Sequence, residues 1–190
     1  MKLILASSSP RRAEVLADAG FVFETLVAGV DETRRKGEPA EAYVRRLAEA
    51  KARAAASRVG PPAVVIAADT AVVVDGELLG KPASPEDAGR MLRRLSGRTH
   101  QVLTGLAVLQ LPEGTACVEL ETTQVTFAPL SETEIESYLA SGEPLDKAGG
   151  YAIQGRGGRF ITRVEGCYFN VVGLPLARLY RMLREMNWAG

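Results

Sequence analysis

Two adjacent arginines follow a short serine run near the start of the chain, in the segment SSSPRR that ends at Arg12. Ser9 and Pro10 predict a helix start, because Ser is a favoured N-cap and Pro suits the first helical position. Arg11 and Arg12 then fall in the first turn, where the helix dipole disfavours a cation by about 0.3–1 kcal/mol. A bound polyanion would offset this repulsion, and Ser8 would add a hydroxyl donor. The segment therefore predicts a phosphate site, with outward-pointing surface ion pairs as the alternative.

Asp69 and Thr70 interrupt an apolar stretch, VVIAADTAVVV, that predicts a buried strand. A buried carboxylate is costly unless it is paired, hydrogen-bonded or bound to a metal. Active sites of α/β proteins lie at the carboxyl ends of sheet strands. Asp69 is therefore a candidate to hold a divalent ion or to take a proton from water. The alternative is a strand end where this side chain only caps a turn.

Two lysines and an acidic pair are further candidates. Lys51 follows Tyr43 and Leu47 at four-residue steps, which places it on the apolar face of a predicted helix. A lysine on such a face can also extend its ammonium to solvent, which is the plainer explanation. Lys81 taken alone is an ordinary loop lysine. The acidic pair is Asp31 and Glu32. Charges in a polar loop are usually solvated, yet these two are the first candidates for a second carboxylate that binds a metal.

A glycine-rich segment, GEPLDKAGGYAIQGRGG, spans Gly142 to Gly158 and indicates tight turns or close approach to a ligand. It matches neither a P-loop nor a dinucleotide-binding motif. His100 is the single histidine and is expected to be structural, so no Ser-His-Asp or Cys-His arrangement is supported. Cys117 and Cys167 stand apart from each other without metal-ligand spacing, which favours reduced thiols and a cytoplasmic location.

Strands and helices alternate along the chain, and together they must position these candidate residues. Helices are predicted where apolar residues recur every three or four positions between capping residues, and strands where β-branched runs end at turn residues. The predicted helices are 10–19, 40–58, 85–95, 132–140 and 174–186, and the predicted strands are 3–6, 22–26, 63–74, 101–111, 117–127 and 160–164. This order predicts an α/β fold with a mixed, twisted β-sheet flanked by helices.

The composition limits the class of protein. The chain has 190 residues, of which 46 % are apolar and 24 % charged, as in a soluble globular protein, and we expect a single domain over residues 1–190. The net charge of zero gives no support for a general nucleic-acid or membrane surface. Neither a signal peptide nor a membrane-spanning stretch is expected. A homodimer is the expectation from base rates alone.

Several blocks of the sequence resemble one known family, in the family's order and over nearly the whole chain. They are LASSSPRR, YVRRLAEAKA, IAADTAVVVDGELLGKP, MLRRLSGRTHQVLTG, GEPLDKAGGYAIQG and NVVGLPL. The family is the Maf family of nucleoside triphosphate pyrophosphatases. The resemblance implies a hydrolase that cleaves the α–β phosphoanhydride bond of a nucleoside triphosphate to give a monophosphate and pyrophosphate. It also implies a fold similar to that of inosine triphosphate pyrophosphatase, a divalent metal (Mg²⁺ or Mn²⁺) and a cytoplasmic location.

The resemblance implies roles for the residues that match the family's motifs. Asp69 matches the proton acceptor, which in the family also contacts the metal. Arg11, Thr70 and Gln154 match three positions that set which base is accepted. This combination resembles the branch that acts on dTTP and UTP, because the sister branch, acting on 7-methyl-GTP, has a tryptophan at the first of these positions.

Four further residues match positions that the family ties to phosphate or metal binding: Arg12, Glu32, Lys51 and Lys81. The arginine and the lysines would supply positive charge on the protein side of a triphosphate. Glu32 would join Asp69 as a metal ligand.

Other functions stay open at this level. One is a non-catalytic nucleotide-binding regulator of septum formation, and another is the same reaction on 7-methyl-GTP or on modified pyrimidine nucleotides. The presence of Asp69, Glu32 and Lys81 favours an enzyme, because binding alone does not require a proton acceptor.

Overall fold

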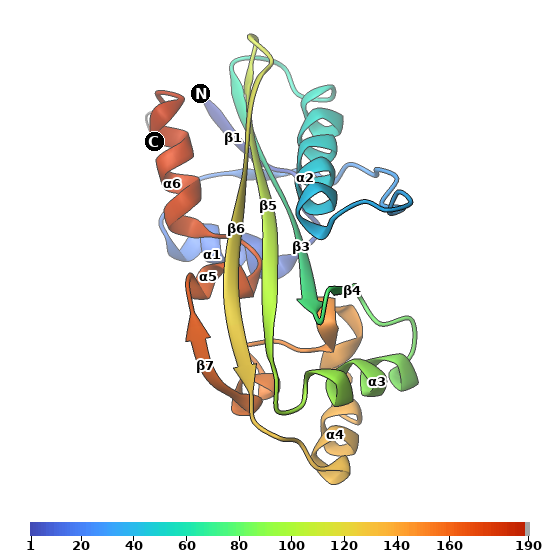
Figure 1. Ribbon diagram of the computed structural model, residues 1–190. Helices are drawn as coiled ribbons and strands as arrows, with labels where there is room; N and C mark the ends of the chain where they lie inside the picture. The colour runs from blue at the N-terminus through green and yellow to red at the C-terminus, as the bar shows by residue number, and fades with distance from the viewer. Residues whose placement is uncertain (189–190) are drawn as a thin grey trace. The chain divides into compact units, whose positions relative to one another are not determined.

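The computed structural model describes residues 1–188, which contain a seven-stranded sheet flanked by helices (Figure 1). The strand order is β2-β1-β3-β5-β6-β7, and β4 pairs with β3 off this path. β1 pairs in parallel with β2 and β3, whereas the β3–β4 and β6–β7 pairs are antiparallel. The predicted α/β fold with a mixed sheet is confirmed.

The elements follow the order that the hydrophobic pattern predicts. The strands are β1 (Lys2–Leu5), β2 (Glu24–Thr25), β3 (Ala63–Val74), β4 (Glu77–Leu79), β5 (Thr99–Leu111), β6 (Thr115–Phe127) and β7 (Ile161–Glu165). The α-helices are α1 (Pro10–Asp18), α2 (Ala40–Ala56), α3 (Pro85–Leu95), α4 (Glu132–Leu139), α5 (Tyr168–Val172) and α6 (Leu176–Glu185). None of the helices within residues 1–188 has both the length and the apolar character needed to cross a lipid bilayer.

The chain forms two compact units. The first contains Met1–Asp69, Thr104–Glu121 and the chain from Gly173 onward, and the second contains Thr70–Leu103 and Thr122–Val172. Strands β3, β5 and β6 each contribute residues to both units. A single domain over residues 1–190 stays a prediction.

In the first unit, α2 packs on the sheet through small residues. Ala48, Ala52 and Ala55 of this helix are fully buried in one core cluster with residues of β1, β3 and β5. The helix comes so close to β5 that a Cβ built on Gly105 would lie 2.2 Å from the backbone oxygen of Val44. Figure 1 shows α2 and α6 on either side of the strands. The glycine thus sets the height of α2 above the sheet.

The second unit has its own hydrophobic core, in which α3 and α4 lie side by side (Figure 1). Tyr138 of α4 and Phe160 meet edge to face there, with ring centroids 5.2 Å apart. Helix α3 begins as predicted, because the side chain of Ser84 accepts a hydrogen bond from the backbone N–H of Asp87 at 3.2 Å. The start of α3 thus follows from a local sequence signal, whereas the core joins residues that are distant in the sequence.

Three features differ from the sequence prediction. β2 is two residues long instead of five, and it pairs only with the last two residues of the short strand β1. The glycine-rich segment folds into three short 3₁₀ helices, Glu143–Asp146, Ala148–Gly150 and Arg156–Phe160. Helix α5 was not predicted. All three depend on contacts between segments that are distant in the sequence.

Candidate active site

Asp69 and Lys51 form the centre of a charged cluster in the first unit. Asp69 lies in β3 and its side chain is 13 % exposed, so the carboxylate is largely out of water. Lys51 lies on the inward face of α2, and its Nζ donates to Oδ1 of Asp69 at 2.6 Å. The helical spacing therefore places Lys51 as predicted, and its ammonium is paired within the protein instead of extending to solvent.

Glu32 completes an acid–base–acid arrangement around the same ammonium. Its Oε1 lies 2.8 Å from Nζ of Lys51, and its side chain is 59 % exposed. It stands on the irregular segment between β2 and α2, residues 26–39. The carboxylates of Glu32 and Asp69 thus converge on one cationic point, Asp69 from the interior and Glu32 from the solvent side.

Arg12 adds a second cation to this cluster. Its Nε donates to the backbone oxygen of Gly173 at 2.8 Å, and its Nη1 donates to Oγ of Ser7 at 3.2 Å. Burial lowers the pKa of Arg12 and the neighbouring Arg11 lowers it further, whereas Asp69 opposes this shift. Arg12 is thus a partly desolvated cation whose electrostatic neighbours include the site carboxylates, and its role in phosphate binding stays a prediction.

The start of α1 carries the other predicted phosphate residues. Pro10 occupies the first helical turn and that turn holds no acidic residue. Ser9 is at the N-cap position, but its side chain makes no capping hydrogen bond, and its backbone N–H donates instead to Oγ of Ser7 at 3.1 Å. Ser8 is exposed and Arg11 is half-buried. Positive charge and a helix N-terminus therefore coincide, which is the arrangement that binds anions.

Opposing effects act on the Asp69 carboxyl group. Burial raises its pKa above the ordinary 3.8, whereas Lys51 and Arg12 lower it and Glu32 raises it. The net direction is upward, so burial outweighs the two cations. A carboxylate with a raised pKa binds a proton more readily than an exposed aspartate, which suits a group that accepts a proton during a reaction.

The two carboxylates fit a magnesium-type ion only in part. Within residues 1–188, no group of three or more His, Cys, Asp and Glu side chains could hold a metal ion. Asp69 and Glu32 nevertheless present oxygen ligands to one point, as their contacts with Lys51 show. Mg²⁺ is usually held by one or two carboxylates with the remaining ligands from phosphates and water. The donor set fits a metal that arrives with a phosphate ligand.

The remaining predicted substrate residues belong to the second unit. Thr70 follows Asp69 directly in β3 and is half-buried, and Lys81 and Gln154 are exposed loop residues. The loops that carry these two are tied together, because the backbone N–H of Gly149 donates to the oxygen of Gly80 at 3.0 Å. The participation of all three residues in the site stays a prediction.

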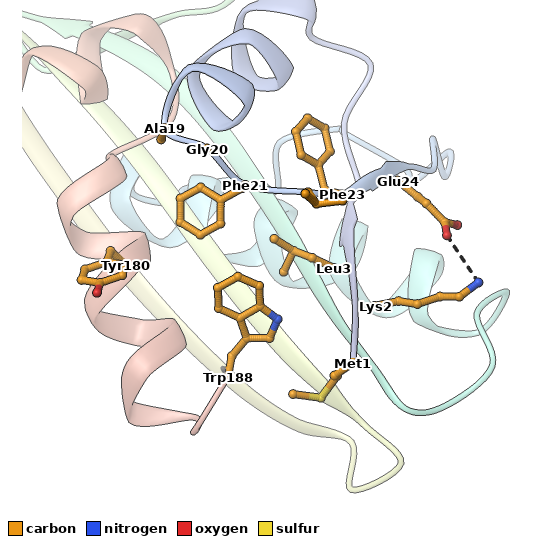
Figure 2. A pocket seen from close by; sticks show the side chains of 11 residues that line it. Met1, Lys2, Leu3, Ala19, Gly20, Phe21, Phe23, Glu24, Tyr180 and Trp188 are labelled. Carbon is orange, nitrogen blue, oxygen red and sulfur yellow. Dashed lines mark ion pairs between the residues drawn. The ribbon is translucent and has the colours of Figure 1, made fainter. Parts of the chain in front are cut away.

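A separate hollow lies elsewhere in the first unit. It is a cavity of about 540 Å³ bordered by aromatic side chains. Among them are Phe21 and Trp188 (Figure 2), whose rings stack with centroids 5.6 Å apart. Its charged residues, Lys2 and Glu24, pair with each other at 3.3 Å. The cavity lies at the amino end of β1, whereas Arg12 follows the carboxyl end, so it lacks both the position and the uncompensated positive charge of a phosphate site.

The single histidine and the cysteines lie outside the charged cluster. His100 is buried, its Nε2 is 2.8 Å from Oη of Tyr151, and burial lowers its pKa to about 4. It is therefore neutral at pH 7 and structural, as expected. Cys117 and Cys167 are both free thiols.

Sequence reasoning missed two contributors to the cluster. Tyr43 donates its hydroxyl hydrogen to the backbone oxygen of Glu32 at 3.0 Å, although its spacing on α2 had indicated only a core position. The second is Gly173, whose backbone oxygen accepts a hydrogen bond from Arg12, 161 positions earlier in the sequence. The block NVVGLPL marked this segment, but no local pattern indicates that its carbonyl binds a guanidinium.

Comparisons with known proteins show which family the chain resembles. The family model described as Maf-like protein matches residues 2–186. A dTTP/UTP pyrophosphatase of Anaeromyxobacter sp. (strain Fw109-5) is 54 % identical over 187 residues, which is 97 % of this chain and 89 % of that protein. A dTTP/UTP pyrophosphatase of Salmonella typhimurium is 50 % identical over 185 residues, 97 % of this chain and 93 % of that protein.

A solved structure is more distant. The nucleoside-triphosphatase (dITP/XTP pyrophosphatase) of Mycobacterium abscessus aligns over 98 % of both chains with 16 % identity and a TM-score of 0.45. At this level nothing about substrate or residue roles follows from it. The family match and the two sequence relatives are decisive by themselves, and they lead to one conclusion: the chain belongs to the Maf-like protein family.

Proposed function

We propose that the chain hydrolyses dTTP and UTP to the monophosphate and pyrophosphate, as a hydrolase acting on the α–β phosphoanhydride bond. The names of relatives with 54 % and 50 % identity over nearly the full length support the reaction and the substrates. The observation that carries the proposal is the cluster in which Lys51 pairs with both Asp69 and Glu32, with Arg12 as a further cation that acts on their charges. A buried carboxylate with a raised pKa suits proton transfer, a role that nucleotide binding alone does not require.

Positive charge is the first requirement of this reaction. A triphosphate carries about four negative charges, and attack at the α-phosphorus requires that they are neutralised and held in place. Arg11, Arg12 and Lys51 supply three cations in the first unit against the carboxylates of Glu32 and Asp69. We assign Lys81 and the hydroxyl of Ser8 to the same task. A bound triphosphate would either take the place of Glu32 as the partner of Lys51 or pair with Lys51 alongside Glu32.

Asp69 is the residue to which we assign proton transfer. Burial raises its pKa, while Lys51 at 2.6 Å keeps a cation beside the charged form. Burial outweighs this cation, so the carboxylate is more basic than an exposed aspartate. A water molecule next to Asp69 would lose its proton to Oδ1 or Oδ2 as it attacks the phosphorus.

A divalent metal belongs to the proposal through the oxygen ligands of Asp69 and Glu32. Bound Mg²⁺ or Mn²⁺ neutralises phosphate charge and lowers the pKa of coordinated water. Lys51 already joins both carboxylates, so its side chain would fix the distance between the two ligands before a metal binds.

Base selection is assigned to Arg11, Thr70 and Gln154. A glutamine amide has both a donor and an acceptor, which matches the edge of thymine or uracil. Cytosine presents the opposite pattern and would leave the donor and the acceptor of this amide unmatched, so we expect CTP to be a poor substrate.

We place the enzyme in the cytoplasm, where its two free thiols would stay reduced. The net charge of zero gives no basis for binding nucleic acid or a membrane. A homodimer remains the base-rate expectation, and light scattering of the purified chain would test it.

The proposal is tested by offering dTTP, UTP, CTP and 7-methyl-GTP with Mg²⁺ and identifying the products. We expect pyrophosphate and the monophosphate in equal amounts from dTTP and UTP, and little product from the other two. Preference for 7-methyl-GTP would contradict the base assignment. Stoichiometric nucleotide binding without pyrophosphate release would contradict an enzyme and support a nucleotide-binding regulator.

Arg11→Trp tests the base assignment more sharply, because tryptophan would remove the guanidinium and supply a stacking surface. We expect the ratio of UTP to 7-methyl-GTP turnover to fall. An unchanged ratio would contradict a part for Arg11 in base selection.

A further inference from the structure

The segment that carries Glu32 has no regular structure of its own. Residues 26–39 join β2 to α2 without a helix or strand, and residues 31–37 are all exposed. A connection of this length is uncommon unless it is functional, and it stays in one place only if other elements hold it. The position of Glu32 beside Lys51 therefore depends on contacts made elsewhere along the segment.

A two-pronged ion pair anchors this segment to α2. Nε of Arg46 lies 2.6 Å from Oε1 of Glu38, and Nη2 lies 2.8 Å from Oε2. The side chain of Glu38 is 8 % exposed, and the hydrogen bond with Arg46 lowers its pKa to about 2. This geometry is the strong, directional form of the guanidinium–carboxylate pair. By contrast, the Arg53–Glu49 pair on the same helix is 55 % and 40 % exposed.

The anchor also holds the backbone next to Glu32. Nη2 of Arg46 donates to the backbone oxygen of Thr33 at 3.2 Å, while the hydroxyl of Tyr43 donates to that of Glu32 at 3.0 Å. The Arg46 guanidinium lies over the Tyr43 ring, 5.6 Å from its centroid. The Arg46 side chain thus binds both Glu38 and Thr33. It also contacts the ring of Tyr43, whose hydroxyl binds the backbone of Glu32.

Glu38 organises its own side of the segment. Its Oε2 accepts the backbone N–H of Arg35 at 3.1 Å, and its backbone oxygen accepts two hydrogen bonds from the Arg34 guanidinium, at 2.9 and 2.6 Å. The residues from Thr33 to Glu38 are therefore closed into a loop whose base is the Arg46 fork.

We propose that the Arg46–Glu38 pair is a positioning device that holds Glu32 at Lys51 and Asp69. Arg46 and Glu38 are positioning residues and not catalytic ones, because the contacts described within residues 1–188 join them to the charged cluster through the loop backbone and Tyr43. The inference rests on the proposed function insofar as Glu32 serves hydrolysis. Breaking the pair leaves Asp69 and Lys51 in place on β3 and α2 and frees the second carboxylate. Metal binding weakens first, and turnover recovers when the metal is raised.

The loop offers a direct readout that does not depend on activity. Arg34, Arg35 and Lys36 are consecutive exposed trypsin sites within it. We expect Glu38→Gln and Arg46→Gln each to speed cleavage at these sites about 10-fold or more. The double variant should be no faster than either single one, because both substitutions break the same pair. Glu49→Gln, which breaks an exposed pair on the same helix, should leave the cleavage rate unchanged.

The second readout is the Mg²⁺ concentration that gives half-maximal UTP hydrolysis. Residues that orient metal ligands change metal affinity or activity by about 10–100-fold when they are substituted, and we expect a rise of that size for Glu38→Gln, with the maximal rate largely restored at saturating Mg²⁺. Arg46→Lys, which keeps the charge and loses the fork, should fall between the wild type and Arg46→Gln.

The outcomes separate this inference from the proposed function. Cleavage rates and Mg²⁺ dependence equal to those of Glu49→Gln would overturn the positioning role, whatever the enzyme does. Faster cleavage together with normal hydrolysis by both Glu38→Gln and Glu32→Gln would overturn the link between the loop and hydrolysis. A wild-type chain that hydrolyses no nucleotide would refute the proposed function, and the trypsin comparison would still decide whether the pair holds the loop.

Discussion

Lys51 holds two carboxylates together, so its removal should leave a buried charge without its main partner. In Lys51→Met the side-chain stem is kept and the ammonium is lost. Asp69, whose side chain is 13 % exposed, then loses a hydrogen bond of 2.6 Å, and Glu32 loses an ion pair of 2.8 Å. Breaking one side of a buried ion pair costs about 3–5 kcal/mol. We expect the low end of this range, about 3 kcal/mol at pH 7, because Arg12 still opposes the charge of Asp69.

The loss should also depend on pH. Burial already raises the pKa of Asp69 above 3.8, and without Lys51 the pKa rises further. A carboxyl group whose pKa is higher in the folded than in the unfolded chain stabilises the fold when protonated. That contribution is lost as the pH rises through the folded-state value. The deficit of Lys51→Met relative to the wild type should therefore shrink as the pH is lowered toward 3.8.

Urea unfolding at several pH values measures both effects. A loss of about 3 kcal/mol corresponds to a fall in Tm of roughly 6–12 °C for a chain of this size. The control is Lys2→Met, since Lys2 pairs with Glu24 at 3.3 Å with both side chains 65 % exposed, and it should change stability by less than about 1 kcal/mol. A Lys51→Met variant that matches this control, or whose deficit is the same at every pH, would refute the account of the cluster.

Two further predictions concern the frame around the site. Gly105→Ala would place a Cβ 2.2 Å from the Val44 backbone oxygen and force α2 off the sheet, so we expect a loss of about 1–3 kcal/mol or more in urea unfolding and reduced turnover. Gly29→Ala has open space around its Cβ and should be neutral in both assays. Glu143→Ala removes the carboxylate that accepts hydrogen bonds from the Tyr138 hydroxyl at 2.7 Å and from the backbone N–H groups of residues 156 and 157. Hydrogen exchange at these two amides should therefore accelerate, and the free energy of unfolding should fall by about 1–3 kcal/mol. Unchanged exchange at these two amides would contradict the role of Glu143 in holding the glycine-rich segment.

Local sequence patterns were sufficient to predict the structure wherever it depends on residues within one segment. The four-residue spacing of Tyr43, Leu47 and Lys51 predicts the inward position of the lysine, and the structure confirms it. The dipeptide Asp75–Gly76 predicts a tight turn, and its two residues adopt φ values of 50° and 76° between β3 and β4. The burial of Asp69 follows from the apolar residues around it in β3.

Tertiary contacts decided the rest. The fork between Arg46 and Glu38 joins two segments whose charges look solvated in sequence, and nothing local distinguishes it from an ordinary surface pair. The segment 22–26 predicts a five-residue strand, but only Glu24 and Thr25 pair with β1, opposite Ile4 and Leu5. Helix α5 makes a contact that no local pattern indicates. The side chain of Asn170 in this helix donates to the backbone oxygen of Val102, 68 positions earlier, at 3.0 Å.

The most direct test of the central claim is the rate of pyrophosphate release from UTP by Asp69→Asn. Asparagine keeps the shape of the side chain and removes the charge and the proton-accepting oxygen, so the fold should persist, which circular dichroism and urea unfolding would verify. We expect turnover to fall by about 100-fold or more, the usual contribution of a general base. Turnover near the wild-type rate in a folded variant would contradict the assignment of Asp69 and with it the proposed site.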